Sequence, residues 1–582
     1  MKKIILFFIL SLLAGNVEAA GPYYVRTDGG TSTQCTGLAD AAYDGSGTGE
    51  ACAYIHPAWS IGATGTTGTL AANETLIIGA GQYMIGYGMP NTSGCSSSAP
   101  YDCVLDTLPN GAKIYGSNYA SCDNTSRTSK PQLWGTQSVP YILHVESTSN
   151  VDIQCLDITD HSDCGFRVGG NQCSETYPNA ETYARVGIYG FGGSGLNMKN
   201  LDVHGLSLYG LQIGGFNGWT REYVNVDGNY FANVEGDRAG HSNTSFSGTI
   251  SILNSKNRYA GCEEAYPPSA TFAHADYSGC TDQNASGYGD GEGTYQSGGN
   301  YVIKNSEWSN SASDGLDLLY HTSGSVSIDK SLFEGNNGNQ LKVVAANLDV
   351  TNSIFIGTCT YLSDSGKVYN TGSWSNCRAN GGIVVTPMLG SVINWFNNTI
   401  VTATHTGGSA AIEVSGNTGA GLNTATCNGT EDWNFSNNIY YSPNATWTIY
   451  YNDLGGVAGG CTTSLNAAAT DHTEIYNFQS NPCPSGTGNL CASDPLFVGS
   501  ISASNSSNVS NIYLTSSSPG KGAGTTNSFW NTSSDFNSFP QNSPVDIGAL
   551  QYGSTSGGGG SSNPTTSMGG VRISLGGGKI SQ

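Results

Sequence analysis

The chain has 582 residues and a formal net charge of −22, because 43 acidic side chains outnumber 21 basic ones. Charged residues make up only 11% of the sequence, against about 25% in an ordinary soluble domain. This balance argues against a nucleic-acid-binding protein, which needs basic side chains for phosphates, and against a coiled coil. The 81 glycines and the 37% hydrophobic content argue against general disorder and indicate a large, polar β protein.

The N-terminal segment has the pattern of a secretory signal peptide. Lys2 and Lys3 precede an apolar run over 4–14, and small residues suited to cleavage follow at 17–20. The run is shorter than the roughly 20 residues that a membrane span needs. We therefore expect residues 1–20 to be a bacterial signal peptide, and the remaining chain to be secreted or held at the cell surface without a membrane span.

The cysteines support an exported protein. There are 16 of them, and an even number in an exported chain favours disulfides over thiolate chemistry. Close pairs are expected to close local loops, although spacing alone does not fix the connectivity: Cys35 and Cys52, Cys164 and Cys173, Cys262 and Cys280, Cys359 and Cys377, Cys427 and Cys461, Cys483 and Cys491. No C-x-x-C or H-E-x-x-H spacing indicates zinc.

A six-residue pattern with apolar ends recurs along the middle of the chain, commonly with asparagine third. Clear copies lie at 198–203, 303–308, 328–333 and 350–355, and weaker ones begin at Ile153, Val226, Ile252, Phe396 and Phe435. Most intervals are near one or two multiples of about 23 residues, and the long ones contain the cysteine-closed inserts. Asparagine tolerates left-handed turns and can stack in a ladder between coils.

A second short strand is expected eleven residues after the third position of four hexamers. It is an apolar-x-apolar triplet at 166–168, 211–213, 316–318 and 341–343. Its outer two side chains should point inward and its middle one outward. A fixed offset over four copies predicts a β-solenoid rather than a β-sandwich. Trp308 and Trp395, at hexamer ends, are expected to pack in the core or at its rim.

These repeats resemble the right-handed parallel β-helix proteins of the pectate-lyase superfamily. Segments 494–498, 518–524 and 546–552 also resemble the endings of secreted bacterial β-helix proteins. The resemblance implies an all-β chain whose residues 21–552 form one right-handed parallel β-helix with disulfide-closed loop inserts, an N-terminal cap and a C-terminal capping segment. Residues 553–582, rich in glycine and serine at their start, are expected to form a linker and tail. We expect a monomer.

Acidic residues are rare in this chain but gather in one stretch. Glu292, Asp317 and Lys342 are 25 residues apart, the local coil length, and should form one outward column about 4.8 Å apart, with Asp290 and Asp314 at turns beside it. Two carboxylates at that distance repel by roughly 3 kcal/mol at an effective dielectric constant near 20. Protonation, side chains that point apart into water, or a cation would relieve this repulsion, and oxygen ligands favour Ca²⁺.

The same stretch resembles family nine of the polysaccharide lyases. In that family an Asp on one coil and an Asp-Asp-Gly-x-Asp motif on the next bind calcium, and a Lys removes the proton beside a uronate carboxylate. Asp290 matches the first Asp, and Asp314 and Asp317 match the last two of the motif. Lys342, after a Gly- and Asn-rich turn, matches the base. Ser313 replaces one expected Asp, for which Glu292 is expected to compensate as a further ligand.

The resemblance implies a secreted, Ca²⁺-dependent polysaccharide lyase that cleaves uronate-containing glycans by β-elimination. Lys342 would be the base, Arg378 would hold a second substrate carboxylate, and Gln340 and His321 would contact the substrate in the groove. Two alternatives stay open. One is a non-catalytic surface β-helix for glycan binding or adhesion, in which the charged column is only a solvated face. The other is a glycoside hydrolase that uses the aspartates.

Overall fold

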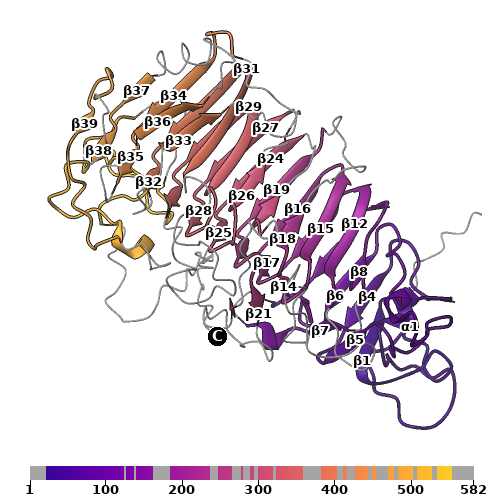
Figure 1. Cartoon of the computed structure of the whole chain (residues 1–582). Helices are drawn as coiled ribbons and strands as arrows, with labels where there is room; N and C mark the ends of the chain where they lie inside the picture. The colour runs from indigo at the N-terminus through magenta and orange to yellow at the C-terminus, as the bar shows by residue number, and fades with distance from the viewer. Residues whose placement is uncertain are drawn as a thin grey trace, which may run out of the picture.

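The structure is a computed structural model of the whole chain. It describes residues 21–122, 126–136, 139–160, 184–235, 247–264, 277–278, 289–293, 299–318, 321, 323–357, 382–402, 410–415, 427–442, 448–453, 469–476, 483–501, 508–526 and 534–553. The described strands are stacked along one solenoid axis, from β1 near the N-terminus to β39 near the C-terminus (Figure 1). Arg378, the signal segment 1–20, the triplet 166–168 and the tail from 554 onward lie outside the described residues.

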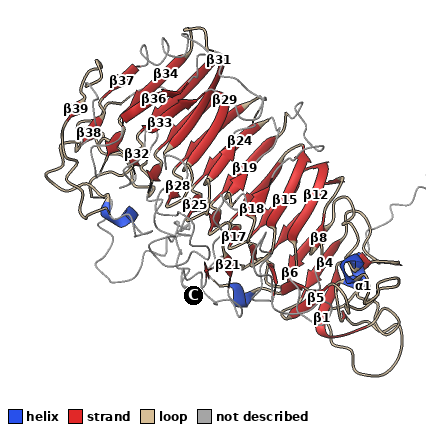
Figure 2. Ribbon diagram, viewed as in Figure 1, coloured by secondary structure: helices blue, strands red, loops and turns tan. Residues whose placement is uncertain are grey.

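The coils contribute strands to three stacks, and the few described helices are short (Figure 2). Stack A consists of β8 (Leu143–His144), β12 (Val186–Ser194), β15 (Tyr209–Phe216), β18 (Ala232–Glu235), β23 (Glu292–Gly293), β26 (Leu316–Leu318), β29 (Leu341–Thr351), β31 (Ile383–Phe396), β33 (Ala410–Ser415) and β36 (Thr448–Asp453). Stack B consists of β1 (Tyr23–Gly30), β4 (Thr75–Ile78), β6 (Lys113–Gly116), β10 (Asp152–Gln154), β13 (Leu196–Lys199), β16 (Trp219–Glu222), β19 (Thr249–Leu253), β24 (Asn300–Lys304), β27 (Ser325–Asp329), the second halves of β29 and β31, β34 (Asp432–Ser436) and β37 (Ala469–Asp471). Stack C consists of β5 (Gln82–Ile85), β7 (Gln132–Gly135), β11 (Asp157–Asp160), β14 (Asp202–His204), β17 (Asn225–Asp227), β20 (Lys256–Arg258), β25 (Glu307–Ser309), β28 (Leu332–Glu334), β30 (Ile354–Ile356), β32 (Thr399–Val401), β35 (Ile439–Tyr441), β38 (Glu474–Tyr476) and β39 (Leu490–Cys491).

The remaining described elements are small additions to these stacks. They are α1 (Ala58–Ile61), β2 (Gly62–Ala63), β3 (Thr66–Thr67), β9 (Thr148–Ser149), β21 (Glu263–Glu264) and β22 (Tyr277–Ser278), with 3-10 turns at 100–102, 127–129 and 508–511. Only β2–β3 and β21–β22 pair as antiparallel strands among the described elements. Within the described residues, no helix is long and apolar enough to cross a membrane.

The stacks pair in parallel from coil to coil, which confirms the predicted right-handed parallel β-helix. The long intervals that begin at Ile153 and Ile252 are each a single coil, because β10 pairs directly with β13 and β19 pairs directly with β24. Two weak hexamers were assigned out of phase. Val226 belongs to stack C, where it pairs with Val203, and Trp395 rather than Phe396 pairs with Val350.

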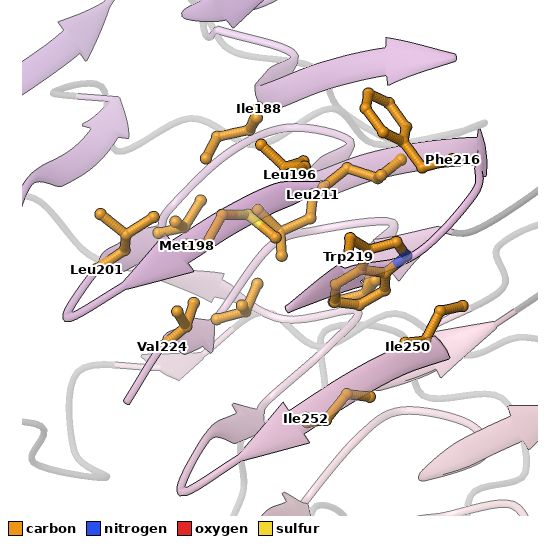
Figure 3. Close-up of a cluster of buried hydrophobic side chains, with 14 of the residues drawn as sticks. Ile188, Leu196, Met198, Leu201, Leu211, Phe216, Trp219, Val224, Ile250 and Ile252 are labelled. Carbon is orange, nitrogen blue, oxygen red and sulfur yellow. The ribbon is translucent and has the colours of Figure 1, made fainter. Parts of the chain in front are cut away.

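The interior is a set of apolar columns to which each coil adds one residue per position. Met198, Leu211 and Ile252 belong to the part shown in Figure 3, where side chains of successive coils pack on one another. In stack C the rings of Trp308, Phe333 and Phe355 lie parallel, with centroids 5.1 and 4.8 Å apart. Trp308 and Trp395 are fully buried, which confirms their expected place in the core. Such burial of apolar surface is the main favourable contribution to folding.

The turns between stacks B and C have the expected left-handed residues. Asn200, Asn305 and Asn352 have φ values of 53°, 50° and 50°, and Lys330 takes the same place with φ 50°. Asn305 Nδ2 donates to Asn254 Oδ1 of the preceding coil at 3.2 Å, which is the predicted ladder. A short polar side chain lowers the cost of the left-handed region, so asparagine suits a turn that must repeat without slipping.

Disulfides hold the ends of the described chain. The predicted pairs Cys35–Cys52 and Cys483–Cys491 are present. Cys95–Cys103 and Cys122–Cys155 are further bridges that the sequence did not single out. Near the C-terminus, Ala549 and Leu550 pack on Ile354 and Val401, so this segment covers the outer side of stack C.

Candidate carboxylate–lysine site

Asp317 and Lys342 lie side by side on the outer surface of stack A. Asp317 of β26 pairs with Lys342 of β29 in parallel register. Their neighbours Leu316 and Leu341 are fully buried, so alternation turns the two charged side chains outward. The prediction that the middle residue of each triplet points outward is therefore confirmed for these two coils.

The ammonium group of Lys342 lies between two carboxylates. Its Nζ is 2.5 Å from Asp314 Oδ2 and 3.5 Å from Asp317 Oδ2. The side chain of Lys342 is 23% exposed, whereas those of Asp314 and Asp317 are 5% and 13% exposed. These partial exposures leave the lysine as the most accessible member of the group. We call Asp290, Asp314, Asp317 and Lys342 the acidic cluster.

The turn before each strand fixes the other two carboxylates. Asp290 Oδ1 accepts the backbone N–H of Asp314 at 3.1 Å, and Asp314 Oδ1 accepts the backbone N–H of Asn339 at 2.6 Å. Each aspartate thus holds the turn of the next coil. Gly338 is required at this turn, because a Cβ there would lie 2.3 Å from Asp314 Oδ1.

The electrostatics of the cluster follow from three buried acids that share one cation. Burial raises the pKa of Asp290 well above its ordinary value, and repulsion from Asp314 and Asp317 raises that pKa further. Burial alone would lower the pKa of Lys342, but attraction by the three aspartates outweighs burial and raises it. The lysine is therefore firmly protonated in this arrangement and serves as the counter-ion of the aspartates.

Glu292 is a correction to the sequence prediction. The coil that follows Glu292 is one residue shorter than the spacing assumed, so Glu292 pairs with Leu316, and Gly293 takes the place beside Asp317. A shift of one residue moves a side chain to the opposite face of a strand. Glu292 consequently points into the core, is 2% exposed, and is separated from the acidic cluster.

The partner of Glu292 is Arg221, an interior residue that the sequence reasoning missed. Arg221 occupies the inward position between Met198 and Ile252, and its guanidinium Nη2 is 2.5 Å from Glu292 Oε2. Neither side chain is more than 2% exposed. The pair is a buried salt bridge within the solenoid core. The signal was present in the sequence, because a charged residue stands where the hexamer requires an apolar one.

Gln340 and His321 also differ from their expected role in the groove. Gln340 is 1% exposed, and its amide group bonds to Asn336 across the turn, with Asn336 Nδ2 donating to Gln340 Oε1 at 2.8 Å. His321 is fully buried, with its ring nitrogens 2.9 Å and 2.8 Å from the carbonyl oxygens of Val344 and Gly299. Both residues hold loops in place and neither faces solvent.

The acidic cluster has the donor chemistry of a hard-cation site, but its side chains are directed at Lys342 and Asn339. Three carboxylates with one ammonium leave negative charge for a divalent cation, and oxygen ligands suit Ca²⁺. Within the described residues, no group of three or more His, Cys, Asp or Glu side chains is arranged as a set of metal ligands. Asp290, Asp314 and Asp317 therefore have the charge and the oxygen ligands that Ca²⁺ requires. They could bind the cation only if it replaced the ammonium group of Lys342 beside Asp314.

Comparison with known proteins finds only weak structural similarity. No family model matches the chain, and no curated protein matches it. Among solved structures, pectate lyase Pel9A is 14% identical, with 92% of this chain and 98% of that chain covered and a TM-score of 0.34. The mannuronan C-5 epimerase AlgE4 A-module from Azotobacter vinelandii is 11% identical, with 72% and 88% covered and a TM-score of 0.30. The Dettilon tailspike protein is 14% identical, with 72% and 62% covered and a TM-score of 0.24. Similarity this low assigns no activity to the chain.

Proposed function

We propose that this protein is a secreted, Ca²⁺-dependent polysaccharide lyase that cleaves uronate-containing glycans by β-elimination. The observation that carries the proposal is the acidic cluster, in which Lys342 lies against Asp314 and Asp317 on adjacent strands. A lysine that is partly exposed, and whose charge state depends on three neighbouring carboxylates, can serve as a base once those carboxylates are neutralised.

The reaction follows from the position of Lys342. Its Nζ would remove the proton on the carbon beside the uronate carboxylate, the electron pair would form a carbon–carbon double bond, and the glycosidic oxygen on the next carbon would leave. The products are an unsaturated uronate end and a new free sugar end. Arg378 is proposed to pair with a second substrate carboxylate, as an Arg fork can.

Asp290, Asp314 and Asp317 would hold the calcium ion. A bound Ca²⁺ neutralises the substrate carboxylate and makes the adjacent proton more acidic. Two of the aspartates, Asp314 and Asp317, also position the lysine, because their carboxylate oxygens lie 2.5 and 3.5 Å from its Nζ. Their repulsion for a polyuronate makes the cation necessary for substrate binding as well as for chemistry, since the chain as a whole carries a net charge of −22.

Export to the cell exterior is part of this proposal. Four disulfides lie within the described residues, and disulfides persist in oxidising compartments such as the cell exterior. An exported enzyme of this kind would meet polymeric glycans outside the cell, and we propose that it acts on them as a monomer.

A screen of uronate polymers with and without a chelator tests the proposal. Polygalacturonate, alginate and a neutral glycan control would be incubated with the full chain, and the ultraviolet absorbance of unsaturated uronate would be followed. We expect absorbance to rise with one polyuronate in Ca²⁺ and to stay flat in chelator. Absence of any unsaturated product over the whole panel would overturn the lyase assignment.

The direct contact between Lys342 and Asp314 also favours a second candidate, a non-catalytic glycan-binding β-helix. In that case the lysine is only a counter-ion and the cluster is a structural salt bridge. Binding of a polyuronate without product formation, unchanged in the variant Lys342→Ala, would support this candidate over the lyase.

A further inference from the structure

We propose that stack A carries an aromatic sugar-binding platform, formed by Tyr141, Tyr189, Tyr209 and Phe231, for a glycan that lies parallel to the solenoid axis. The inference deepens the proposed function, because the same glycan would reach Lys342. It concerns a part of the surface that lies several coils toward the N-terminus from the acidic cluster, near the strands labelled β12 and β15 in Figure 1.

The strand register places the platform in line with the acidic cluster. Tyr189 of β12 pairs with Gln212 of β15, and Gln212 pairs with Glu235 of β18. Glu235 in turn pairs with Gly293, and Gly293 pairs with Asp317. Four strand spacings of about 4.8 Å separate Tyr189 from Asp317 by about 19 Å. The three residues between them are Gln212, which is buried, Glu235, which is acidic, and Gly293, which has no side chain.

A second row of side chains leads to the same cluster. Val186 pairs with Tyr209, and Tyr209 pairs with Ala232. These three side chains form an apolar group of their own, apart from the main core, and Tyr141, Tyr189 and Phe231 pack against them. In the same register the row continues to Asp290 and Asp314, two residues before Glu292 and Leu316. This row of largely buried residues therefore changes from apolar and aromatic to acidic along the axis of stack A.

The rings pack on one another, and Tyr209 is buried beneath the other three. Tyr141 and Tyr189 are stacked with centroids 5.1 Å apart, and Tyr209 and Phe231 meet edge to face at 5.4 Å. Tyr141, Tyr189 and Phe231 are only partly buried. His144 Nδ1 lies 2.8 Å from Thr107 Oγ1 at the rim, which adds polar groups beside the rings. Ordered aromatic rings that stay partly in water at a polar surface offer flat apolar faces for a ligand.

A glycan chain is the occupant that fits this geometry. The C–H faces of a pyranose ring stack on aromatic faces, whereas its hydroxyl groups would bond to polar groups at the rim, such as the Thr107 hydroxyl and the Glu146 carboxylate, which lies 3.1 Å from His144 Nε2. A chain several sugars long, extended along the axis, would contact the platform and the acidic cluster together. A single sugar would contact only one of them.

The test compares long and short substrates. Tyr189→Leu and Tyr141→Ala remove the aromatic faces, Tyr189→Phe keeps the ring, and Tyr119→Ala removes an exposed tyrosine of another surface as a matched control. We expect the first two variants to raise KM for polyuronate about 3- to 10-fold, with kcat and the turnover of di- and trisaccharides unchanged. Tyr189→Phe and Tyr119→Ala should behave as the wild type, and thermal melting checks that each variant is folded.

Binding must also be measured without turnover, so that failure of the lyase and failure of the platform remain distinguishable. The tyrosine variants are made in the Lys342→Ala background, so that no polymer is cleaved. Affinity gel electrophoresis through polygalacturonate and through alginate then measures how strongly each polymer retains the protein. Loss of retention in folded Tyr189→Leu supports the platform even where no polymer is cleaved. Retention and KM equal to the wild type in both Tyr189→Leu and Tyr141→Ala would overturn the platform, and so would absence of retention of the wild type on every polyuronate.

Discussion

Replacement of Lys342 by alanine should have two opposite effects: it should abolish product formation and strengthen Ca²⁺ binding. In the cation-free protein the ammonium group is the counter-ion of Asp314 and Asp317, at 2.5 and 3.5 Å. A calcium ion must displace this ammonium, which then loses its attraction to a carboxylate. Two unit charges about 4 Å apart interact by about 4 kcal/mol at an effective dielectric constant of 20.

Solvent reduces that magnitude, because the lysine side chain is 23% exposed. If about half of the interaction survives, roughly 2 kcal/mol separates the two proteins, which corresponds to about 30-fold tighter Ca²⁺ binding by Lys342→Ala. Calorimetric titration with CaCl₂ measures the difference. Lys304→Ala is the matched control, since Lys304 is an exposed lysine on β24 that lies beside Asp329 in the register. Equal or weaker Ca²⁺ binding by Lys342→Ala would refute the idea that the lysine and the cation share one site.

Three further predictions concern the interior and the ends of the solenoid. Glu292→Gln should lower the free energy of unfolding by about 3–5 kcal/mol, because Arg221 is left as an unpaired buried charge. In chemical denaturation, the double variant Arg221→Met with Glu292→Leu should recover most of this loss. A double variant no more stable than Glu292→Gln would contradict the explanation. Gly338→Ala should abolish activity and lower the melting temperature, since a Cβ would clash with Asp314 Oδ1 and lie 2.9 Å from the backbone nitrogen of Asp314; full activity would show that the turn adapts. Burial, with repulsion from Asp494, raises the pKa of Glu474 from 4.5 to about 8, so the folded protein keeps a proton that the unfolded chain has released between these values. The stability contribution is therefore fully present below pH 4.5 and is lost as pH rises through about 8, on the order of 5 kcal/mol. Denaturation midpoints measured against pH should show this decline in the wild type and not in Glu474→Gln.

The repeat was readable from the sequence because a solenoid imposes one rule on each coil. An inward position needs an apolar side chain and a left-handed turn needs asparagine or a similar residue, so Met198 and Asn200 indicate the same structure as Ile303 and Asn305. The predicted strands, their parallel pairing and the ladder of asparagines follow from that rule. The size of each insert does not follow, because a loop can lengthen without changing the stack.

The site was predicted in part, and the errors share one physical cause. Asp317 and Lys342 were placed correctly because the coil between them has the length that the spacing assumed, as the register shows. The preceding coil is one residue shorter, so the same arithmetic put Glu292 on the wrong face of its strand. The spacing predicts an outward position for the charged Glu292, whereas its salt bridge with Arg221 makes burial of both side chains tolerable.

Burial could not be read from the sequence at Gln340 and His321 either. Both residues stand in turns, where polar side chains usually face water. Here Gln340 donates to the carbonyl of Asn336 in its own turn, and a ring nitrogen of His321 bonds to the carbonyl of Val344 on the next coil. The aromatic platform could not be predicted from the sequence for a related reason. Tyr141 and Tyr189 are distant in the chain, and only the pairing of β8 with β12 brings their rings together.

The structure of the reaction product is the most direct test of the central claim that Lys342 acts as the base of a β-elimination. Polyuronate digested by the wild-type chain in Ca²⁺ would be compared by mass spectrometry with digests by Lys342→Ala and by Lys304→Ala. The account predicts unsaturated uronate ends from the wild type and from Lys304→Ala, and none from Lys342→Ala or in chelator. Saturated ends, which indicate hydrolysis, or unsaturated ends formed equally by Lys342→Ala, would contradict it.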